Sequence, residues 1–216
     1  SSPHQLKKTF SPPRKKEEEQ PASNCQGFAY YSVVSDALDE VSSTRSRLAK
    51  DKALSKAFGR LRGCGVEDVE AACYLMAPVR DSQGGGHRLQ PDHQHEPLNI
   101  SYRVVEKALL DSIGASAATL RSTASRFEGD WGEAAAALSS GRKRKNWFVS
   151  PDAAEKDIAL LTCVGVRSRL LELGKTNGNG SEDAKRRGLS RLFRDARGNE
   201  LKWLVRTAFA HMSTGI

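Results

Sequence analysis

The sequence predicts an all-α protein, an irregular array of about ten to twelve short helices forming one domain over residues 27–216, behind a flexible tail. Three observations support this fold class. Apolar residues recur every three to four positions, no stretch alternates apolar and polar residues with period two, and glycine, proline or polar clusters separate the periodic segments. With 38% hydrophobic residues among 216, the chain can bury a sizeable core.

Residues 1–26 are expected to form a disordered tail. They combine four prolines with a block of mixed charge at 14–19 and few apolar residues. The run Pro-Pro-Arg-Lys-Lys at 12–16 fits a nuclear-import signal, and it fits a solvated tail equally well. The chain begins Ser-Ser-Pro rather than with Met, so we expect it to be a piece of a longer protein.

From residue 27 onward, successive segments place apolar residues on one face of a helix, at spacings of three and four. Each of these faces is expected to point into the core. In chain order they are formed by Val34, Ala37, Leu38 and Val41; Leu54, Ala57, Phe58 and Leu61; Val66, Val69, Ala72, Cys73 and Met76; Val104, Val105, Ala108, Leu109, Ser112 and Ile113; Leu120, Ala124 and Phe127.

Two further helices have predicted N-caps, Asp130 before residues 132–138 and Thr162 before residues 163–173. Residues 80–97 and 139–157 lack the helical period and are predicted to be long surface loops. The apolar faces of the last three helices are formed by Val166, Leu170 and Leu173; Leu189, Leu192, Phe193 and Ala196; Leu201, Leu204, Val205, Ala208, Phe209 and Met212.

The balance of charge favours an anionic partner. The formal net charge is +8, and nucleic acid is the commonest partner of such a basic chain, although a merely basic globular protein is the alternative. The four cysteines, at 25, 64, 73 and 163, include no Cys-x-x-Cys pair, which argues for reduced thiols rather than a zinc ribbon. The sequence contains no run of about 18 apolar residues, so it predicts no membrane-spanning helix.

Several short sequence patterns are similar to known binding or catalytic motifs but lack residues that those motifs need. Gly174-Lys-Thr176 ends like a P-loop, but Arg169 stands where that loop needs its first glycine, and a helix rather than a strand precedes it. His93 and His95 lie in a polar loop without ordered neighbours, so we expect no metal site. No Ser-His-Asp or Cys-His arrangement can be argued. We therefore expect neither catalytic nor metal-binding residues in this segment.

The strongest candidate site is the glycine-rich segment 173–185, which opens a basic helix. Gly178 and Gly180 let the backbone approach a ligand closely, and Ser181 is the expected N-cap, so helix amides would face a bound phosphate. Residues 167–206 hold eleven Lys and Arg against five Asp and Glu, which supports phosphate contact. The basic run at 142–145, next to Trp147, is either a second such contact or a solvated loop.

Gly178-x-Gly180-x-x-x-Ala184 is also similar to a helix-hairpin-helix turn, but Asn179 and Arg187 occupy two positions where that turn needs apolar residues. A second resemblance extends over residues 27–216. It rests on six blocks in order: Asp39-Glu-Val with Thr44-x-x-Arg47-Leu48; Leu98-Asn-Ile100 with Val105-x-Lys107-Ala108; Gly129-Asp-x-Gly132; Leu161-Thr162 with Val166; Gly178-x-Gly180-Ser181-x-x-x-Lys185; and Glu200 with Arg206, followed by Ala210-His-Met-Ser-Thr-Gly-Ile216.

In these blocks the chain resembles the N-terminal DNA-binding domain of eukaryotic-type, ligase I-like ATP-dependent DNA ligases. The resemblance implies a domain that grips duplex DNA, without sequence preference, over the minor groove on both sides of a nick. It also implies a role in DNA replication, repair and recombination, a nuclear or organellar location, and a parent chain that uses ATP and Mg²⁺. Ser213 departs from the family, which has an arginine there.

The family's catalytic Lys-x-Asp-Gly motif is absent here, so we expect this segment to bind DNA, to work with the catalytic domain of its parent chain, and to need no cofactor itself. The competing hypothesis is an all-helical scaffold whose basic face binds an acidic protein or a membrane surface; such a scaffold needs no glycine loop. Carried onto this sequence, the DNA contacts are expected from Arg47, Lys175, Gly178, Gly180, Ser181, Lys185, Arg186 and Arg206.

Overall fold

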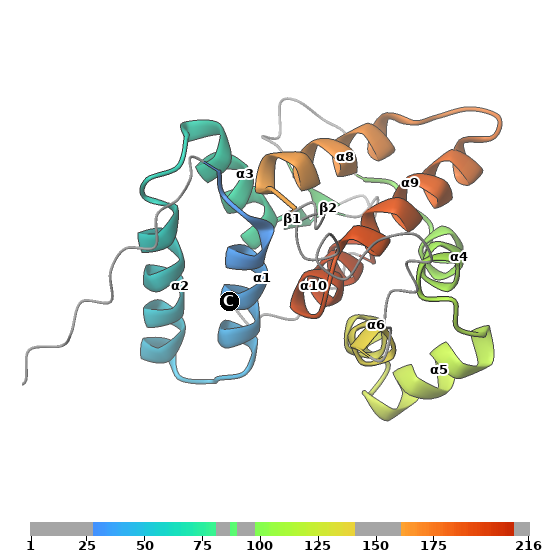
Figure 1. Ribbon diagram of the computed structural model, residues 1–216, viewed down its shortest axis with the longest axis horizontal. Helices are drawn as coiled ribbons and strands as arrows, with labels where there is room; N and C mark the ends of the chain where they lie inside the picture. The colour runs from blue at the N-terminus through green and yellow to red at the C-terminus, as the bar shows by residue number, and fades with distance from the viewer. Residues whose placement is uncertain (1–27, 81–86, 90–97, 141–160, 210–216) are drawn as a thin grey trace, which may run out of the picture.

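Short helices dominate the computed structural model, which describes residues 28–80, 87–89, 98–140 and 161–209 (Figure 1). This confirms the all-α prediction, and the nine helices within the described ranges are fewer than the ten to twelve expected. They are α1 (Tyr31–Ser42), α2 (Arg47–Leu61), α3 (Val66–Met76), α4 (Tyr102–Ile113), α5 (Ala117–Arg126), α6 (Trp131–Ser140), α8 (Cys163–Lys175), α9 (Ser181–Asp195) and α10 (Asn199–Ala208).

The two predicted loops fall largely outside the described residues, as do the tail at 1–26, the basic run at 142–145, Met212 and Ser213. The first loop contains a short antiparallel pair, β1 (Val79–Arg80) and β2 (His87–Arg88). Leu89 follows β2 and is fully buried. Its carbonyl accepts a hydrogen bond from Nε of Arg167 at 2.7 Å, so this part of the predicted surface loop is anchored to α8.

Helix α10 lies at the centre of the domain, with α1 on one side and α6 on the other (Figure 1). Every residue from Leu201 to Ala208 is buried, and Trp203 is the largest side chain with no exposed surface. A helix that is buried all round needs apolar residues on more than one face: Leu201, Leu204 and Val205 form one face, and Trp203 lies on the opposite one. The core therefore forms around the last helix of the described chain.

Most predicted apolar faces are confirmed as core, with four exposed residues as exceptions, one of which is Cys73 in α3. Phe58 is 42% exposed, because α2 contacts α1 through a narrow stripe of Ala53, Ala57 and Leu61, and Phe58 falls beside that stripe. Val66, the first residue of α3, is 84% exposed, and Phe127, just after α5, is 38% exposed. The helical period identifies a face, but only the packing partner determines how wide the buried part of that face is.

Two predicted N-caps are confirmed and one is wrong. The Thr162 hydroxyl accepts from the amide of Gly165 at 3.1 Å, and Asp130 Oδ1 accepts from the amides of Gly132 and Glu133 at 2.8 and 3.0 Å. Ser181 is not a cap, because α9 begins with Ser181 itself and its N-cap is Gly180, in the left-handed conformation at φ +79°. The glycine takes a backbone conformation that a serine would resist.

The motif Gly129-Asp-x-Gly132 joins α6 to the central helix. Gly129 has φ +88°, which turns the chain out of α5. Gly132 lies so close to α10 that an added Cβ would stand 2.6 Å from the backbone carbonyl oxygen of Lys202. Since that neighbour is backbone, it cannot swing aside, and only glycine lets the two helices approach this closely.

Replacing Gly132 by alanine is therefore expected to lower the free energy of unfolding by about 1–3 kcal/mol, the usual cost of overpacking, despite the better helix propensity of alanine. The matched control is Gly59→Ala in α2, where an added Cβ meets no atom within 4 Å. That change should raise stability by up to about 1 kcal/mol. Urea unfolding of the two variants measures both effects, and equal effects would contradict the close approach of α6 to α10.

Candidate nucleic-acid interface

Residues 176–180 form the glycine loop between α8 and α9, at one edge of the domain (Figure 1). Gly178 and Gly180 have φ +92° and +79°, and a Cβ added to either would meet no protein atom within 4 Å. The glycines are thus required by backbone conformation and not by crowding inside the domain. Residues 177–180 are exposed, so the backbone of this loop is open to close approach from outside.

The start of α9 leaves backbone donors beside this loop. The amide of Ser181 donates to the Gly178 carbonyl, and the first helical hydrogen bond runs from Ala184 to Gly180, both at 3.1 Å. The amides of Glu182 and Asp183 have no backbone acceptor within the described part of the chain. Such donors favour an anion at a helix N-terminus, although the two exposed carboxylates of the same turn oppose one.

Lys185 connects the start of α9 to the start of α4. Lys185 is only 6% exposed, and its Nζ donates to the carbonyl of Asn99 at 3.0 Å. Burial lowers the pKa of the Lys185 ammonium, and Glu182 opposes that effect. Asn99 has φ +43°, and Ser101 then caps α4 by accepting from the amide of Val104 at 3.4 Å. Two helix N-termini are thus held side by side by a buried cation.

Sequence reasoning missed this second helix N-terminus as part of the candidate site. It matched residues 98–100 to a family block, but it gave Asn99 and Ser101 no role. The available signal was a serine just before the helical period that starts at Tyr102, which is the pattern of an N-cap. No local pattern could show that Lys185 donates to the Asn99 carbonyl beside this helix, because the two residues are 86 positions apart in the sequence.

Arg206 is engaged inside the domain. It is 8% exposed, its guanidinium pairs with Asp130, with Nε 3.1 Å from Oδ2, and it lies 4.4 Å from the centre of the Trp203 ring. The Glu133 carboxylate forms two ion pairs: its Oε1 lies 3.6 Å from the Arg206 guanidinium and 2.5 Å from Nζ of Lys202. We call these four charged residues the Asp130–Arg206 network. The structure gives Arg206 a supporting role at the centre of the fold, and its DNA contact stays a prediction.

The Asp130–Arg206 network also sets the protonation of Asp130. Burial alone would raise the pKa of this carboxyl group. The hydrogen bonds from the Arg206 guanidinium and from the amides of Glu133 and Gly132 outweigh burial and hold the pKa below its usual range. Asp130 therefore stays ionised at neutral pH, where it both caps α6 and pairs with α10.

The remaining predicted contacts separate into two places. Lys175, at the end of α8, is exposed next to the glycine loop. Arg186 is partly exposed, with Nε 3.6 Å from Asp111 and 3.7 Å from Asp183, so it is shared between α4 and its own helix. Arg47 is exposed as the first residue of α2, and α2 lies on the opposite side of the domain from the loop (Figure 1). The structure does not bring Arg47 together with the other predicted residues.

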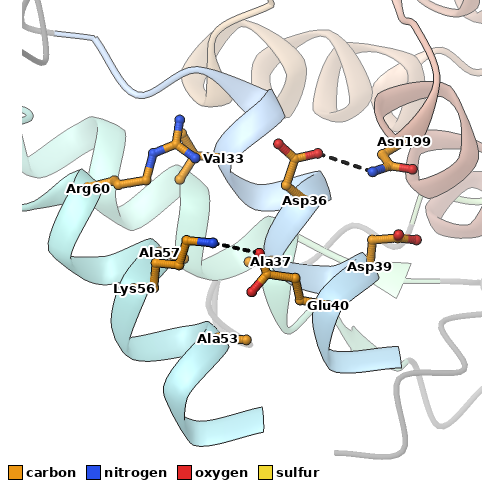
Figure 2. Close-up of a pocket in the computed structure, with 10 residues that line it drawn as sticks. All are labelled: Val33, Asp36, Ala37, Asp39, Glu40, Ala53, Lys56, Ala57, Arg60 and Asn199. Atoms are coloured by element: carbon orange, nitrogen blue, oxygen red, sulfur yellow. Dashed lines mark hydrogen bonds and ion pairs between the residues drawn. The ribbon is translucent and has the colours of Figure 1, made fainter. Parts of the chain in front are cut away.

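A polar pocket of about 240 Å³ lies between α1, α2 and the start of α10 (Figure 2). Its side chains already pair with one another. Asn199 donates to Asp36 at 3.1 Å, and Lys56 lies 2.8 Å from Glu40, as Figure 2 shows. Asp39 is bound by Lys202 of the Asp130–Arg206 network. In the described ranges no three His, Cys, Asp or Glu side chains cluster as a metal ion would require. This pocket is a junction between helices.

In a basic all-α domain, an open glycine loop at the start of one helix with a second helix N-terminus beside it is an arrangement that favours the binding of anions. A family model described as "DNA ligase N terminus" matches residues 30–216, so this chain belongs to that family. None of the described helices is long and apolar enough to cross a membrane.

Relatives from archaea and from a plant are named as DNA ligases. The chain is 28% identical over 126 residues to a DNA ligase of Thermococcus fumicolans, covering 58% of this chain and 21% of that protein. It is 26% identical over 188 residues to DNA ligase 2 of Thermofilum pendens, covering 86% and 28%. It is 28% identical over 176 residues to DNA ligase 6 of Arabidopsis thaliana, covering 80% and 11%. The matched part of the chain thus spans between 11% and 28% of the length of these three relatives.

Proposed function

We propose that this domain binds duplex DNA at nicks, without sequence preference, as the N-terminal domain of an ATP-dependent DNA ligase acting in replication, repair and recombination. The observation that carries the proposal is the solvent-open glycine loop at the start of α9, in a chain of the DNA ligase N terminus family. The relatives named above are DNA ligases, and the rest of such a parent chain would supply ATP- and Mg²⁺-dependent chemistry in the nucleus.

Backbone donors explain the lack of sequence preference. The amides of Gly178–Gly180, of Glu182 and Asp183, and those at the start of α4 can donate to phosphate oxygens, which are the same at every base pair. The exposed cations next to them, Lys175 and Arg187 on either side of the loop and Arg103 in α4, add a charge attraction that is also independent of sequence. The domain would position the duplex, and the catalytic domain of the same parent chain would seal the nick.

Binding of a nicked duplex over a range of salt concentrations tests the proposal. The logarithm of the affinity should fall linearly with the logarithm of the salt concentration, by about 0.9 for each phosphate contact, and should be the same for unrelated sequences. Nicked duplex should bind more tightly than heparin or vesicles of acidic lipid. Equal affinity for all three would instead favour a scaffold whose basic face binds acidic proteins or membranes.

A further inference from the structure

A second pocket, of about 540 Å³, lies between the start of α4, the turn after α5, the start of α6 and the end of α10. We call it the α4–α6 pocket. Four aromatic side chains line it, those of Tyr102, Phe127, Trp131 and Phe209. Its volume is within the range of about 300–1,000 Å³ that is typical of ligand sites, and aromatic linings are common in such sites. DNA binding as proposed above gives this pocket no role.

Three of the four rings form an aromatic wall. The centre of the Tyr102 ring lies 5.3 Å from that of Trp131, edge to face at 88°, and 4.9 Å from that of Phe209. The Trp131 and Phe209 centres are 5.7 Å apart. Tyr102 is 52% exposed and Phe127 is 38% exposed, so these rings are open to a ligand. The face of an aromatic ring is electron-rich and attracts cations.

The α4–α6 pocket is negatively charged, although the chain as a whole is basic. Its lining holds the carboxylates of Glu128 and Asp130 against one guanidinium, that of Arg206, so it has a net charge of −1 in a chain of +8. Arg206 is 8% exposed and already pairs with Asp130 and Glu133. Glu128 is exposed and makes no ion pair with the described residues. The pocket is therefore complementary to a cation and not to a phosphate.

Backbone hydrogen bonds fix the turn that carries Glu128. The amide of Gly129 donates to the carbonyl of Ala124, and the amide of Asp130 donates to the carbonyl of Phe127, both at 2.9 Å. Between them Glu128 has φ +55°, in the left-handed region that usually selects glycine. A carboxylate is thus held at the pocket in an unfavourable backbone conformation, which is a feature found at ligand-binding sites.

Among organic cations, a guanidinium suits this lining best. It is planar, so it can stack on an aromatic ring, and it can donate two parallel hydrogen bonds to one carboxylate. The domain already contains two such contacts, with Arg206 4.4 Å from the Trp203 ring centre and Arg167 4.7 Å from that of Tyr74. The pocket is several times larger than one guanidinium, so neighbouring residues of a peptide would fill the rest of it.

We propose that the α4–α6 pocket binds an arginine side chain presented by a peptide segment of a partner protein. The guanidinium pairs with the Glu128 carboxylate and stacks on the exposed aromatic rings, while apolar residues next to the arginine lie against the aromatic wall. This is a protein-binding activity on a surface separate from the glycine loop, and it does not depend on DNA binding.

The test uses labelled peptides of glycine, alanine and leucine around one central residue. Fluorescence anisotropy with the 216-residue chain compares arginine, its neutral isostere citrulline, and glutamate at that central position. The arginine peptide should bind at least about tenfold more tightly than the citrulline peptide, because only the guanidinium carries the charge. The glutamate peptide should show no binding. Free N-acetylarginine amide should compete only weakly, which distinguishes a peptide from a small free cation.

Two variants with matched controls locate the contact. Glu128→Gln should weaken binding of the arginine peptide about tenfold and leave the citrulline peptide unchanged; Glu67→Gln, at another exposed carboxylate without an ion pair among the described residues, should change neither. Phe127→Leu keeps an apolar side chain but loses the ring, and should weaken the arginine peptide at least about threefold. Phe58→Leu, at a ring of similar exposure on α2, should not.

Nuclear magnetic resonance gives a direct readout at the aromatic wall. The indole N–H signal of Trp131, assigned by its loss in Trp131→Phe, should shift with the arginine peptide and not with the citrulline peptide. Circular dichroism and urea midpoints equal to those of the wild type show that each variant is folded. Nicked duplex should bind Glu128→Gln and Phe127→Leu as it binds the wild type.

Three results would overturn the inference, and none of them bears on the glycine loop. Equal affinity for the arginine and citrulline peptides would remove the guanidinium as the ligand. Loss of nicked-duplex affinity in Phe127→Leu, with peptide binding unchanged, would make the pocket a contact for nucleobases. Self-association in sedimentation that Phe127→Leu abolishes, without binding of the arginine peptide, would make it an interface between two copies of this chain.

Discussion

Replacing Gly180 by valine is expected to weaken binding of nicked duplex DNA by at least about tenfold, a loss of about 1.4 kcal/mol, while the domain stays folded. Gly180 is the N-cap of α9 at φ +79°, where a side chain costs about 1–2 kcal/mol and a β-branched one fits least well. The loop would have to change conformation, and its amides would leave the positions from which they meet a phosphate. The apolar face of α9, formed by Leu189, Leu192 and Phe193, remains to hold the helix.

The matched control is Gly65→Val, because Gly65 is also a helix N-cap glycine but has φ −62°, which valine adopts readily. A Cβ there makes only an ordinary contact, 3.7 Å from Asp68. Fluorescence anisotropy with labelled nicked duplex gives the affinities, and circular dichroism shows whether each variant is folded. If Gly180→Val bound DNA as the wild type does, the glycine loop would not be the phosphate site.

The largest effect on stability is expected from Arg206→Ala, which should lower the free energy of unfolding by about 3–5 kcal/mol. The change leaves Asp130 without its main partner in a partly buried position, with Lys202 alone to balance the remaining carboxylates of the Asp130–Arg206 network. It also removes the guanidinium that packs over the buried Trp203 ring. Because α10 is the centre of the core, the whole domain should unfold more easily, as urea denaturation will measure.

Arg169→Ala provides the comparison, since Arg169 pairs with Asp195 at 2.9 Å on the surface, where both side chains are more than a third exposed. Its loss should cost less than about 1 kcal/mol.

The excess cost of Arg206→Ala over Arg169→Ala in the free energy of unfolding should shrink on acidification. The lowered pKa of Asp130 stabilises the fold above the ordinary aspartate value of about 4, and that contribution is lost as the pH falls through the folded-state pKa. A folded, equally stable Arg206→Ala that lost DNA affinity would instead support the DNA contact.

The local sequence determined where the helices form and where several of them begin. Thr162 and Asp130 cap helices through amides two or three residues further along the chain, so their roles can be predicted from spacing alone. The glycines at 178 and 180 likewise indicate left-handed backbone wherever they stand in a loop. The apolar period placed α1, α4, α8, α9 and α10 correctly because each helix must turn one face to a core, whatever packs against it.

The partners of the charged residues were decided by the tertiary structure alone. Lys185 meets Asn99, Arg206 meets Asp130 and Lys202 meets Asp39, across 86, 76 and 163 residues of sequence. By pattern these cations look like solvated or DNA-facing charges, since lysine and arginine are usually exposed. They are buried here because helices distant in sequence pack together and bring a carbonyl or a carboxylate within hydrogen-bonding distance, which offsets the cost of removing a charge from water.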